Sequence, residues 1–362
     1  MHVGVDVRWM LGKVRGMGRY ATQLIAPVRA SCTGLAPTGS EVKNMASVCK
    51  GNSFFPWWEQ VVLPKLAKSH SFDFLICPYN TAPLIKPANT KLILVVHDLI
   101  FLRSFKELPL SVSVYQTLGR LYRRAIVPRV VKNADVLLTV SEFTKQELVE
   151  RFKLDAHKVQ VIPNAISDDW LRLAPLPTVL RKPYLFTVTG EAPSKNVIRL
   201  IEAFALAKQS FSDNYSLKIA GIKKEHHSQF IARAVSLRVA NDVEFLGFIS
   251  NEELQCLYRE ATGFIFASLF EGFGIPLIEA MAAGTPVCCS NTTSLPEVVG
   301  NAALLFDPKS VEEMAMSINT LLAYEEGERL ENIQQGRLRV QSFVESSVNK
   351  QMTDFWRRLG VE

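Results

Sequence analysis

Short apolar runs recur along the whole chain and are separated by stretches with helix-like character. A strand that is apolar at consecutive positions buries both of its faces, which is typical of a parallel sheet covered by helices on both sides. Parallel strands need long crossover connections, and these are usually helices. We therefore predict an α/β protein with two doubly wound parallel sheets, with strands at residues 2–7, 72–77, 91–96, 135–140 and 158–163 and at 184–190, 216–221, 242–247, 263–268 and 285–290.

The two groups of runs indicate two domains. The chain has 362 residues, of which 48% are hydrophobic, so it is long enough for two domains that each bury a core. The segment Asp168–Pro183 is rich in proline and shows no periodic pattern, so it is predicted as the linker. We predict Rossmann-like domains at residues 1–170 and 171–345, followed by a C-terminal helix within 346–362.

Charge is distributed unevenly between the two halves. Residues 1–170 hold 22 Lys and Arg against 13 Asp and Glu, whereas the remaining residues hold 19 against 22. A basic N-terminal half suits an anionic partner such as a membrane surface, nucleic acid or a phosphorylated substrate. The densest basic cluster lies at 115–132, either as a helix on a membrane or as a solvated helix. No nucleic-acid recognition motif accompanies it, so nucleic-acid binding is only a remote alternative.

The six cysteines favour a reducing compartment. They show no C-x-x-C spacing, and the adjacent pair Cys288 and Cys289 suits neither a disulfide nor a zinc site. The N-terminal residues lack the apolar core of a signal peptide. The strongly apolar run Leu92–Val96 is far shorter than the roughly 20 residues that span a bilayer. We therefore expect a cytoplasmic protein with no metal site and no membrane-spanning helix.

The segment from Glu271 to Glu279 (EGFGIPLIE) follows a predicted strand and begins a predicted helix. Gly272 and Gly274 allow backbone N–H groups to approach an anion, and Pro276 suits the first helical turn. The helix N-terminus adds unpaired N–H donors and the positive end of its dipole. The pattern indicates a site for a phosphate-bearing ligand. The two carboxylates either accept hydroxyl groups of a sugar and a ribose or merely interact with the helix dipole.

Two other strand ends carry weaker signals of the same kind. Lys195 follows the strand at 184–190 and either neutralises a diphosphate or is a solvated loop lysine. Gly16 and Gly18, next to Arg19, form a glycine-rich turn into a helix, and a plain turn is equally consistent with them. Ala21 stands where a dinucleotide fingerprint has its last glycine, which disfavours a nicotinamide-dependent dehydrogenase.

His97 and Asp98 stand at the end of the strand at 91–96. A histidine at this place either contacts a sugar or moves a proton, or it is a buried core residue with satisfied hydrogen bonds. His226 and His227 have no carboxylate at metal-ligand spacing, so they are predicted to lie on the surface.

Taken together, these segments resemble family 4 glycosyltransferases with the GT-B architecture of two Rossmann-like domains that face a cleft. The resemblance runs through nearly the whole chain, and the E-x7-E segment at 271–279 is its most specific part. The other matching segments are GMGRYATQL (16–24), FPWWEQVVLP (55–64), PYNTAPL (78–84), VVHDLIF (95–101), NADVLLTVSEFTKQEL (133–148), VIPNAI (161–166), SKN (194–196) and TTSLPEVVGNAALLFDP (292–308).

The resemblance implies retaining transfer of a sugar from a nucleoside-diphosphate sugar to an acceptor hydroxyl, without a metal cofactor. The matching positions imply that Glu271 holds the donor sugar, Glu279 the ribose and Lys195 the diphosphate, while His97 lies near the transferred sugar. The C-terminal helix is expected to return to the N-terminal domain, which binds the acceptor. Further donor-binding positions implied by the resemblance are Gly16, Gly18, Gly272, Phe273, Gly274 and Ile275.

One position departs from the family pattern. Many members place an arginine where this chain has Glu191, so the diphosphate clamp lacks one cation. Either Lys195 and the helix N-terminus suffice, or an arginine such as Arg19 substitutes. Arg19 and Asp98 are therefore weaker candidates for contacts with the diphosphate or the acceptor.

The resemblance also suggests a biological role. The segments VVHDLIF and PYNTAPL are similar to those of mannosyl- and rhamnosyl-transferring members, which favours GDP-mannose as donor. The implied acceptor is a lipid-linked glycan of O-antigen or exopolysaccharide assembly. The enzyme would then be peripheral at the inner face of the cytoplasmic membrane. A sugar-nucleotide epimerase or a phosphorylase with the same fold is the enzymatic alternative.

Overall fold

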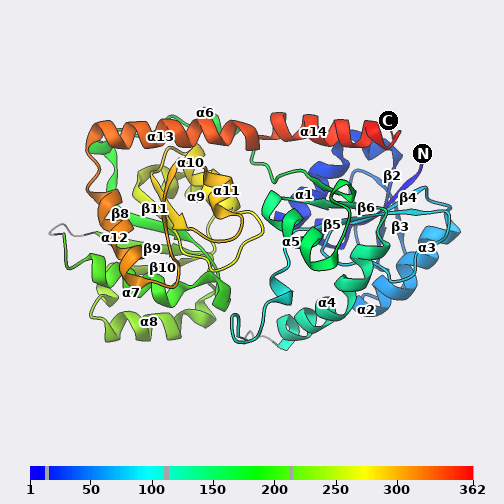
Figure 1. The fold of residues 1–362 in the computed structure, drawn as a ribbon, viewed down its shortest axis with the longest axis horizontal. Coiled ribbons are helices and arrows are strands. Elements are labelled where there is room, and N and C mark those ends of the chain that lie inside the picture. Colours follow the sequence, from blue (N-terminus) through cyan, green and yellow to red (C-terminus); the bar gives the residue numbers. More distant parts are fainter. Residues whose placement is uncertain (13–15, 110–113, 212–214, 362) are drawn as a thin grey trace. The chain divides into compact units, whose positions relative to one another are not determined.

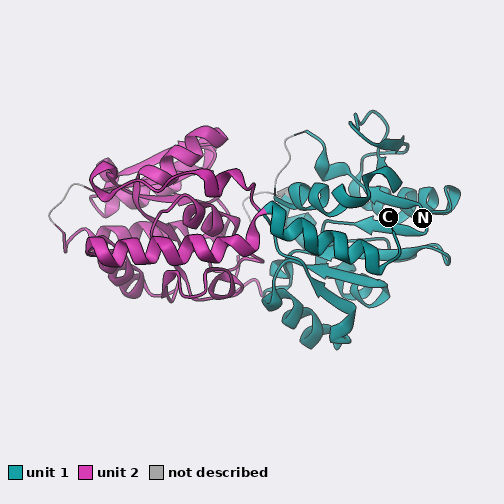
Figure 2. Ribbon diagram, turned by 90° about the horizontal axis from the view of Figure 1, so that it is seen from above, with its two compact units in different colours: residues 1–103, 112–165, 345–362 teal, residues 104–111, 166–344 magenta. Residues whose placement is uncertain are grey.

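The computed structural model describes residues 1–12, 16–109, 114–211 and 215–361. The chain divides into two compact units, which Figure 2 shows in different colours. Unit 1 contains the N-terminal segments and the C-terminal helix, and unit 2 contains most of the second half. Their residues are 1–103, 112–165 and 345–362 for unit 1, and 104–111 and 166–344 for unit 2.

Unit 1 is built on a seven-stranded sheet in the order β3-β2-β1-β4-β5-β6-β7. All neighbouring strands are parallel. The chain moves outward from β1 in one direction and then, from β4 onward, in the other, which places its right-handed crossovers on opposite faces of the sheet. The strands are β1 (Val3–Asp6), β2 (Cys32–Ala36), β3 (Ala46–Cys49), β4 (Phe74–Cys77), β5 (Lys91–Val96), β6 (Val136–Thr139) and β7 (Val159–Val161).

Unit 2 repeats this plan with a six-stranded parallel sheet in the order β10-β9-β8-β11-β12-β13. Here the direction reverses between β8 and β11. The prediction of two doubly wound parallel sheets is confirmed. The strands are β8 (Lys182–Val188), β9 (Ser216–Ala220), β10 (Val243–Gly247), β11 (Ala261–Phe266), β12 (Val287–Ser290) and β13 (Ala303–Phe306).

Helices connect the strands in both units (Figure 1). In unit 1 they are α1 (Gly16–Ile25), α2 (Phe55–Trp57), α3 (Leu63–Ser69), α4 (Val114–Asn133), α5 (Glu142–Phe152) and α14 (Glu345–Arg358). In unit 2 they are α6 (Asp169–Arg172), α7 (Val197–Ala207), α8 (His227–Ser236), α9 (Asn251–Glu260), α10 (Ile275–Ala282), α11 (Leu295–Val299), α12 (Val311–Leu322) and α13 (Glu326–Val340).

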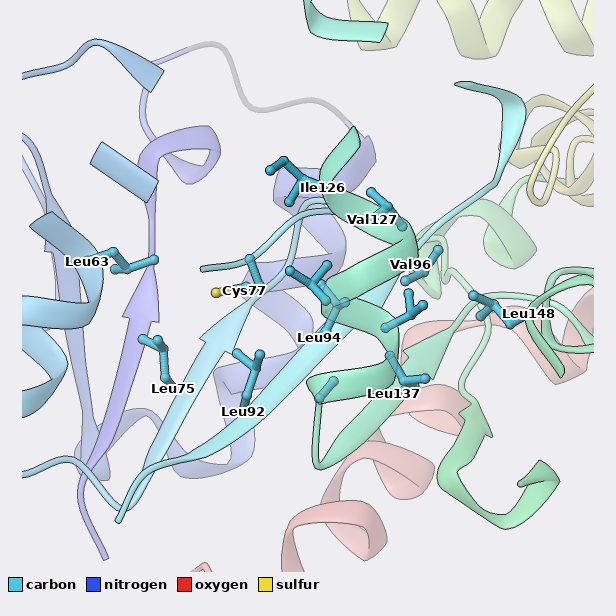
Figure 3. Close-up of a cluster of buried hydrophobic side chains, with 14 of the residues drawn as sticks. Leu63, Leu75, Cys77, Leu92, Leu94, Val96, Ile126, Val127, Leu137 and Leu148 are labelled. Atoms are coloured by element: carbon cyan, nitrogen blue, oxygen red, sulfur yellow. The ribbon is translucent and has the colours of Figure 1, made fainter. Parts of the chain in front are cut away.

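The core of unit 1 lies between its central strands and helices α4 and α5. Figure 3 shows Leu94 and Val96 of β5 near Ile126 and Val127 of α4, with Leu148 of α5 beyond them. These side chains are all buried. Burying one such side chain contributes about 1.5–3 kcal/mol, so this face fixes α4 against the sheet.

The predicted linker does not form an extended connection. It contains α6, whose Trp170 is buried, and it belongs to unit 2. Arg337 of α13 donates from Nη1 to the carbonyl oxygens of Leu173 and Ala282 at 2.8 and 2.6 Å, and from Nη2 to Leu171 at 2.5 Å. These long-range hydrogen bonds order a segment whose sequence has no periodic pattern.

The C-terminal helix, expected within 346–362, is α14, and it packs within unit 1. Its buried face includes Val348, Met352 and Phe355. The indole Nε1 of Trp356 donates to the carbonyl oxygen of Leu24 at 2.6 Å. The two ends of the chain thus contribute to the same compact unit.

Candidate functional site

The candidate site of unit 2 lies where the direction of the sheet reverses. β8 and β11 are adjacent and parallel, and the loops that follow them leave from the same edge of the sheet. In doubly wound sheets this switch point is the usual ligand-binding place. The loop after β8 carries Lys195, and the loop after β11 carries Glu271.

Those two side chains form an ion pair, with 2.5 Å between Nζ of Lys195 and Oε1 of Glu271. Their side chains are 30% and 16% exposed, so the pair is partly open to solvent. The structure therefore brings together two residues that the sequence placed on separate strand ends. Lys195 is thus paired with Glu271 and only partly solvated.

Asn196 holds the Lys195 loop against the end of β11. Its Nδ2 donates to the carbonyl oxygens of Ala267 and Pro308 at 3.0 and 2.7 Å, and its backbone adopts a left-handed φ of 59°. The N–H of Leu269 donates to the carbonyl oxygen of Ser194 at 2.7 Å. These contacts fix the position of the Lys195 backbone. They also give Ser194 and Asn196, the neighbours of Lys195 in the SKN segment, a structural role.

The loop between β11 and α10 holds four consecutive backbone N–H groups for which the described residues supply no acceptor. Within the part of the chain that the structure describes, the N–H groups of Gly272, Phe273, Gly274 and Ile275 donate to no protein acceptor. They lie at the N-terminus of α10, where the helix dipole is positive. Such a cluster of unpaired donors is suited to an anion.

Two hydroxyl side chains of the loop before α11 support this arrangement. Ser294 Oγ donates to the carbonyl oxygens of Glu271 and Phe273, both at 3.1 Å, and Thr293 Oγ1 accepts from the N–H of Glu271 at 3.2 Å. Gly274 has φ 114°, and a Cβ there would lie 2.9 Å from Leu295 Cδ2. The loop conformation therefore requires glycine at position 274.

Glu279 lies further along α10 and is buried. Its Oε2 accepts a hydrogen bond from the hydroxyl group of Tyr258 at 3.0 Å. Burial raises the pKa of Tyr258, and the nearby carboxylate raises it further, so the phenol stays protonated and acts as donor. No sequence pattern singles out Tyr258, because a tyrosine in an amphipathic helix looks like an ordinary core residue.

The cation missing at Glu191 has no direct replacement on this loop. Arg199, in the first turn of α7, donates from Nη1 to Oδ1 of Asn196 at 3.0 Å. Arg19 is exposed on α1 of unit 1. Gly16 and Gly18 of the same unit lie within the first turn of α1 and not in a loop before it, and Gly18 is buried.

His97 is buried in unit 1, and one of its two ring nitrogens makes a hydrogen bond to the backbone. Nε2 lies 2.9 Å from the carbonyl oxygen of Pro78, which can only accept, so Nε2 carries the hydrogen. Burial lowers the pKa of His97 to about 4, and the ring edge packs on Tyr20 with 5.2 Å between the centroids. The imidazole is therefore neutral near pH 7. This disfavours proton transfer and leaves Nδ1 as an acceptor.

Asp98 has a local structural role. Its Oδ1 accepts from the N–H of Ile100 at 3.0 Å and begins the short helical turn at 100–102. Among the described residues, no group of three His, Cys, Asp or Glu side chains is arranged as a metal site requires. The six cysteines are free thiols, and none of the described helices is long and apolar enough to cross a membrane.

Two protein-family models match consecutive parts of the chain. A model described as "Glycosyltransferase Family 4" matches residues 28–170, and one described as "Glycosyl transferases group 1" matches residues 174–339. The chain therefore contains a glycosyltransferase family 4 domain and a glycosyl transferases group 1 domain. The two matched ranges follow one another along the chain, and both strand ends of the candidate site lie in the second range.

Among curated proteins, the chain is similar to "O-antigen chain mannosyltransferase B" of Escherichia coli, with 32% identity over 197 residues, 51% of each chain. It is also similar to "O-antigen chain mannosyltransferase RfbU" of Salmonella typhimurium, with 29% identity over 248 residues, 66% of this chain and 67% of that protein. The match therefore spans about half the length of the first relative and two thirds of the second.

Two solved structures share the fold along nearly the whole chain. Anabaena Alr3699/HepE, in complex with UDP and glucose, aligns with a TM-score of 0.74 at 17% identity and covers 98% of both chains. WaaG, a glycosyltransferase involved in lipopolysaccharide biosynthesis, aligns with a TM-score of 0.70 at 16% identity and covers 98% of this chain and 99% of WaaG. The two Rossmann-like units are those of the GT-B fold.

Proposed function

We propose that the chain is a retaining hexosyltransferase that moves a sugar, with mannose favoured, from a nucleoside-diphosphate sugar to a hydroxyl group of a glycan. The observation that carries this proposal is the run of four unpaired N–H groups, Gly272 to Ile275, beside the Lys195–Glu271 pair. The names of the mannosyltransferase relatives support GDP-mannose as donor and surface polysaccharide as product.

In this proposal the Lys195–Glu271 pair opens when the donor binds. Lys195 Nζ passes from the carboxylate to the diphosphate, and Glu271 then accepts hydroxyl groups of the sugar. Before binding, each charge neutralises the other, so neither is left unpaired in a partly buried site. Glu279, held by Tyr258, would accept from the ribose hydroxyl groups.

The proposed catalytic contribution follows from where negative charge develops. As the glycosidic bond breaks, the diphosphate gains charge, which the loop N–H groups and Lys195 stabilise more strongly than in the ground state. Because these groups supply positive charge, the proposal requires no metal ion. Gly272, Phe273, Gly274 and Ile275 are thus the donor-binding amides of the proposal.

Retention of configuration is assigned to front-face transfer. In this scheme the leaving phosphate oxygen takes the proton of the acceptor hydroxyl, and Glu271 orients the sugar without attacking it. The neutral His97 would accept a hydroxyl hydrogen bond through Nδ1 and act as a positioning group.

We also propose a lipid-linked acceptor and peripheral binding of unit 1 to the inner face of the cytoplasmic membrane. The exposed cations Arg129 and Lys132 of α4 support this contact, as do Leu118 and Leu121, which are 60% and 46% exposed on the same helix. A basic helix with exposed apolar side chains suits an anionic lipid surface.

A thermal-shift panel of nucleotide sugars tests the donor assignment. A donor at 100 times its Kd stabilises the protein by about 2.7 kcal/mol. GDP-mannose should raise the Tm of the wild type and of the control variant Lys182→Ala. Lys182 is the first residue of β8 and forms an ion pair with Glu260. GDP-mannose should raise the Tm of Lys195→Ala much less. The proposal fails if no nucleotide sugar stabilises the wild type, or if Lys195→Ala responds fully.

A further inference from the structure

Phe273 is the side chain that anchors the loop between β11 and α10. It stands between Gly272 and Gly274, and glycine restricts the backbone less than any other residue. Phe273 is only 5% exposed, whereas its N–H group donates to no acceptor among the described residues. The positions of the loop N–H groups therefore depend in part on where the ring of Phe273 is held.

The ring of Phe273 packs on that of Phe343 in an edge-to-face arrangement. The ring centroids lie 5.4 Å apart and the ring planes meet at 84°, which is a favourable geometry for an aromatic pair. Phe343 is 7% exposed and ends the short 3₁₀ turn Gln341–Phe343 that follows α13. A Cβ on Gly336 of α13 would lie only 3.2 Å from Cβ of Met281 in α10, so these two helices pack closely. The contact joins segments that are distant in the sequence, so no local pattern indicates it.

Phe343 is held by two further contacts. The guanidinium carbon of Arg339 lies 4.9 Å from the centroid of its ring. Arg339 is itself fixed at the end of α11, where Nε donates to the carbonyl oxygen of Val298 at 3.0 Å and Nη2 to that of Glu297 at 2.6 Å. The N–H of Ile166 donates to the carbonyl oxygen of Phe343 at 3.0 Å. A connected set of contacts therefore runs from the loop to Ile166.

Ile166 and Val344 stand at two places where the chain passes between the units. The chain enters unit 2 at Ile166 and leaves it after Val344. Both residues are buried, and they form an isolated parallel bridge with each other. The contact between Phe273 and Phe343 thus joins the loop that would bind the diphosphate to this bridge, and all four residues belong to unit 2.

We propose that Phe343 is a positioning residue for the donor loop, which acts through Phe273 and links the loop to the Ile166–Val344 bridge. The inference rests on the proposed function, because the loop receives a diphosphate only if the chain binds a nucleotide sugar. Since coupling between two sites is reciprocal, a ligand that fixes the loop should also protect the bridge.

Amide NMR of the full chain without any ligand tests the positioning role. Phe343→Leu keeps an apolar side chain but removes the ring, so the amide signals of Gly272 and Gly274 should move. The control is Phe230→Leu in α8, which lies across unit 2 from α13 (Figure 1). Phe230 is 4% exposed and its ring stacks on that of Phe245 with 6.2 Å between the centroids, so this variant loses a comparable ring contact. It should leave both glycine signals in place.

A double-mutant cycle separates this role from a general loss of stability. Phe343→Leu and Phe273→Leu should each weaken GDP binding by about three- to tenfold, the range expected for loss of one aromatic pair. The double variant should bind GDP about as weakly as either single variant, because the second substitution removes a contact that is already lost. Phe230→Leu should bind GDP like the wild type.

Hydrogen exchange at Ile166 tests the link to the bridge. Saturating GDP should slow exchange of the Ile166 N–H by about threefold or more in the wild type, and much less in Phe343→Leu. The N–H of Val239, which donates to the carbonyl oxygen of Ala234 at 3.0 Å just after α8, is the reference for a uniform gain in stability.

The outcomes separate the two proposals. If neither GDP nor GDP-mannose binds the wild type, the proposed function fails, and the ligand-free NMR alone decides whether Phe343 positions the loop. Unmoved glycine signals in folded Phe343→Leu, or additive losses of GDP affinity in the cycle, overturn the positioning role. Equal slowing at Ile166 and Val239 in the wild type overturns the link to the bridge, and this measurement needs no variant.

Discussion

Lys195 and Glu271 neutralise each other across 2.5 Å, and this contact sets the behaviour of the candidate site at the scale of single residues. The sequence predicted both residues because each follows a predicted strand. It did not predict Tyr258, Thr293 or Ser294, which brace the site from other elements. Hydroxyl side chains in helices and loops carry no spacing signal, so only the folded structure identifies them.

The two glutamates should respond differently to substitution. Glu279→Gln should weaken binding of free GDP, because this ligand keeps the ribose that Glu279 would hold. Loss of a hydrogen bond to a charged group costs roughly 1.5–3 kcal/mol, which titration calorimetry resolves. Glu271→Gln should leave GDP affinity equal or higher, because Lys195 loses its internal partner. Equal losses of GDP affinity in both variants would contradict these roles.

His97 should make stability depend on pH. Burial lowers its pKa from 6.5 to about 4, so between these values the unfolded state binds the proton more readily and stability falls as pH falls. The contribution at pH 5 should be about 2 kcal/mol smaller than at pH 7.5.

Urea unfolding of the wild type and of His97→Gln at both pH values measures this contribution. The wild type should lose more stability than the variant when the pH is lowered. Identical pH dependence in the two proteins would mean that His97 is not buried as a neutral group.

At the scale of elements, apolar runs predicted most of the described strands, including β7 and β10, which have partly exposed positions. They did not predict β2, β3 or β13. β3 is a largely exposed edge strand, β2 contains Thr33 and Gly34, and β13 is only four residues long with partly exposed positions. An exposed edge strand such as β3 needs few apolar residues, so hydrophobicity alone does not reveal it. The positions of β2, β3 and β13 follow from pairing with strands that are already placed.

The backbone conformation of the β11–α10 loop requires a glycine at position 274, and substitution tests this requirement. Gly274→Ala would require a positive φ and place a Cβ 2.9 Å from Leu295. We expect a loss of about 1–3 kcal/mol in the free energy of unfolding, together with weaker GDP binding. Gly327→Ala in α13 meets no atom within 4 Å and should raise stability by about 0.5–1 kcal/mol. A fully stable Gly274→Ala variant with normal GDP affinity would contradict the loop's conformation.

At the scale of the whole molecule, the N-terminal half is predicted to be basic, and the basic residues of its helix α4 fall into two groups with different roles. Arg120 Nη2 and Arg124 Nη1 both donate to the carbonyl oxygen of Arg103 at 2.8 Å, so these arginines help to hold the turn before α4. Arg129 and Lys132 are exposed. The sequence could identify the basic helix but not this division, because the partners of Arg120 and Arg124 are backbone carbonyls.

Substitution should separate these two groups. Arg129→Gln with Lys132→Gln should weaken binding to vesicles that contain anionic lipid, each charge contributing roughly 1 kcal/mol near the surface. Arg120→Gln with Arg124→Gln should instead lower thermal stability. Vesicle co-sedimentation and a thermal melt measure the two effects. Normal co-sedimentation of the Arg129 and Lys132 variant would reject α4 as the membrane contact.

The central claim is that the loop amides and Lys195 receive the diphosphate of a nucleotide sugar. Amide NMR of protein labelled with ¹⁵N-glycine, titrated with GDP-mannose, reports on Gly272 and Gly274 directly. We expect saturable shifts of both amide signals that are strongly reduced in Lys195→Ala. Saturable binding of GDP-mannose with both signals unmoved would contradict it.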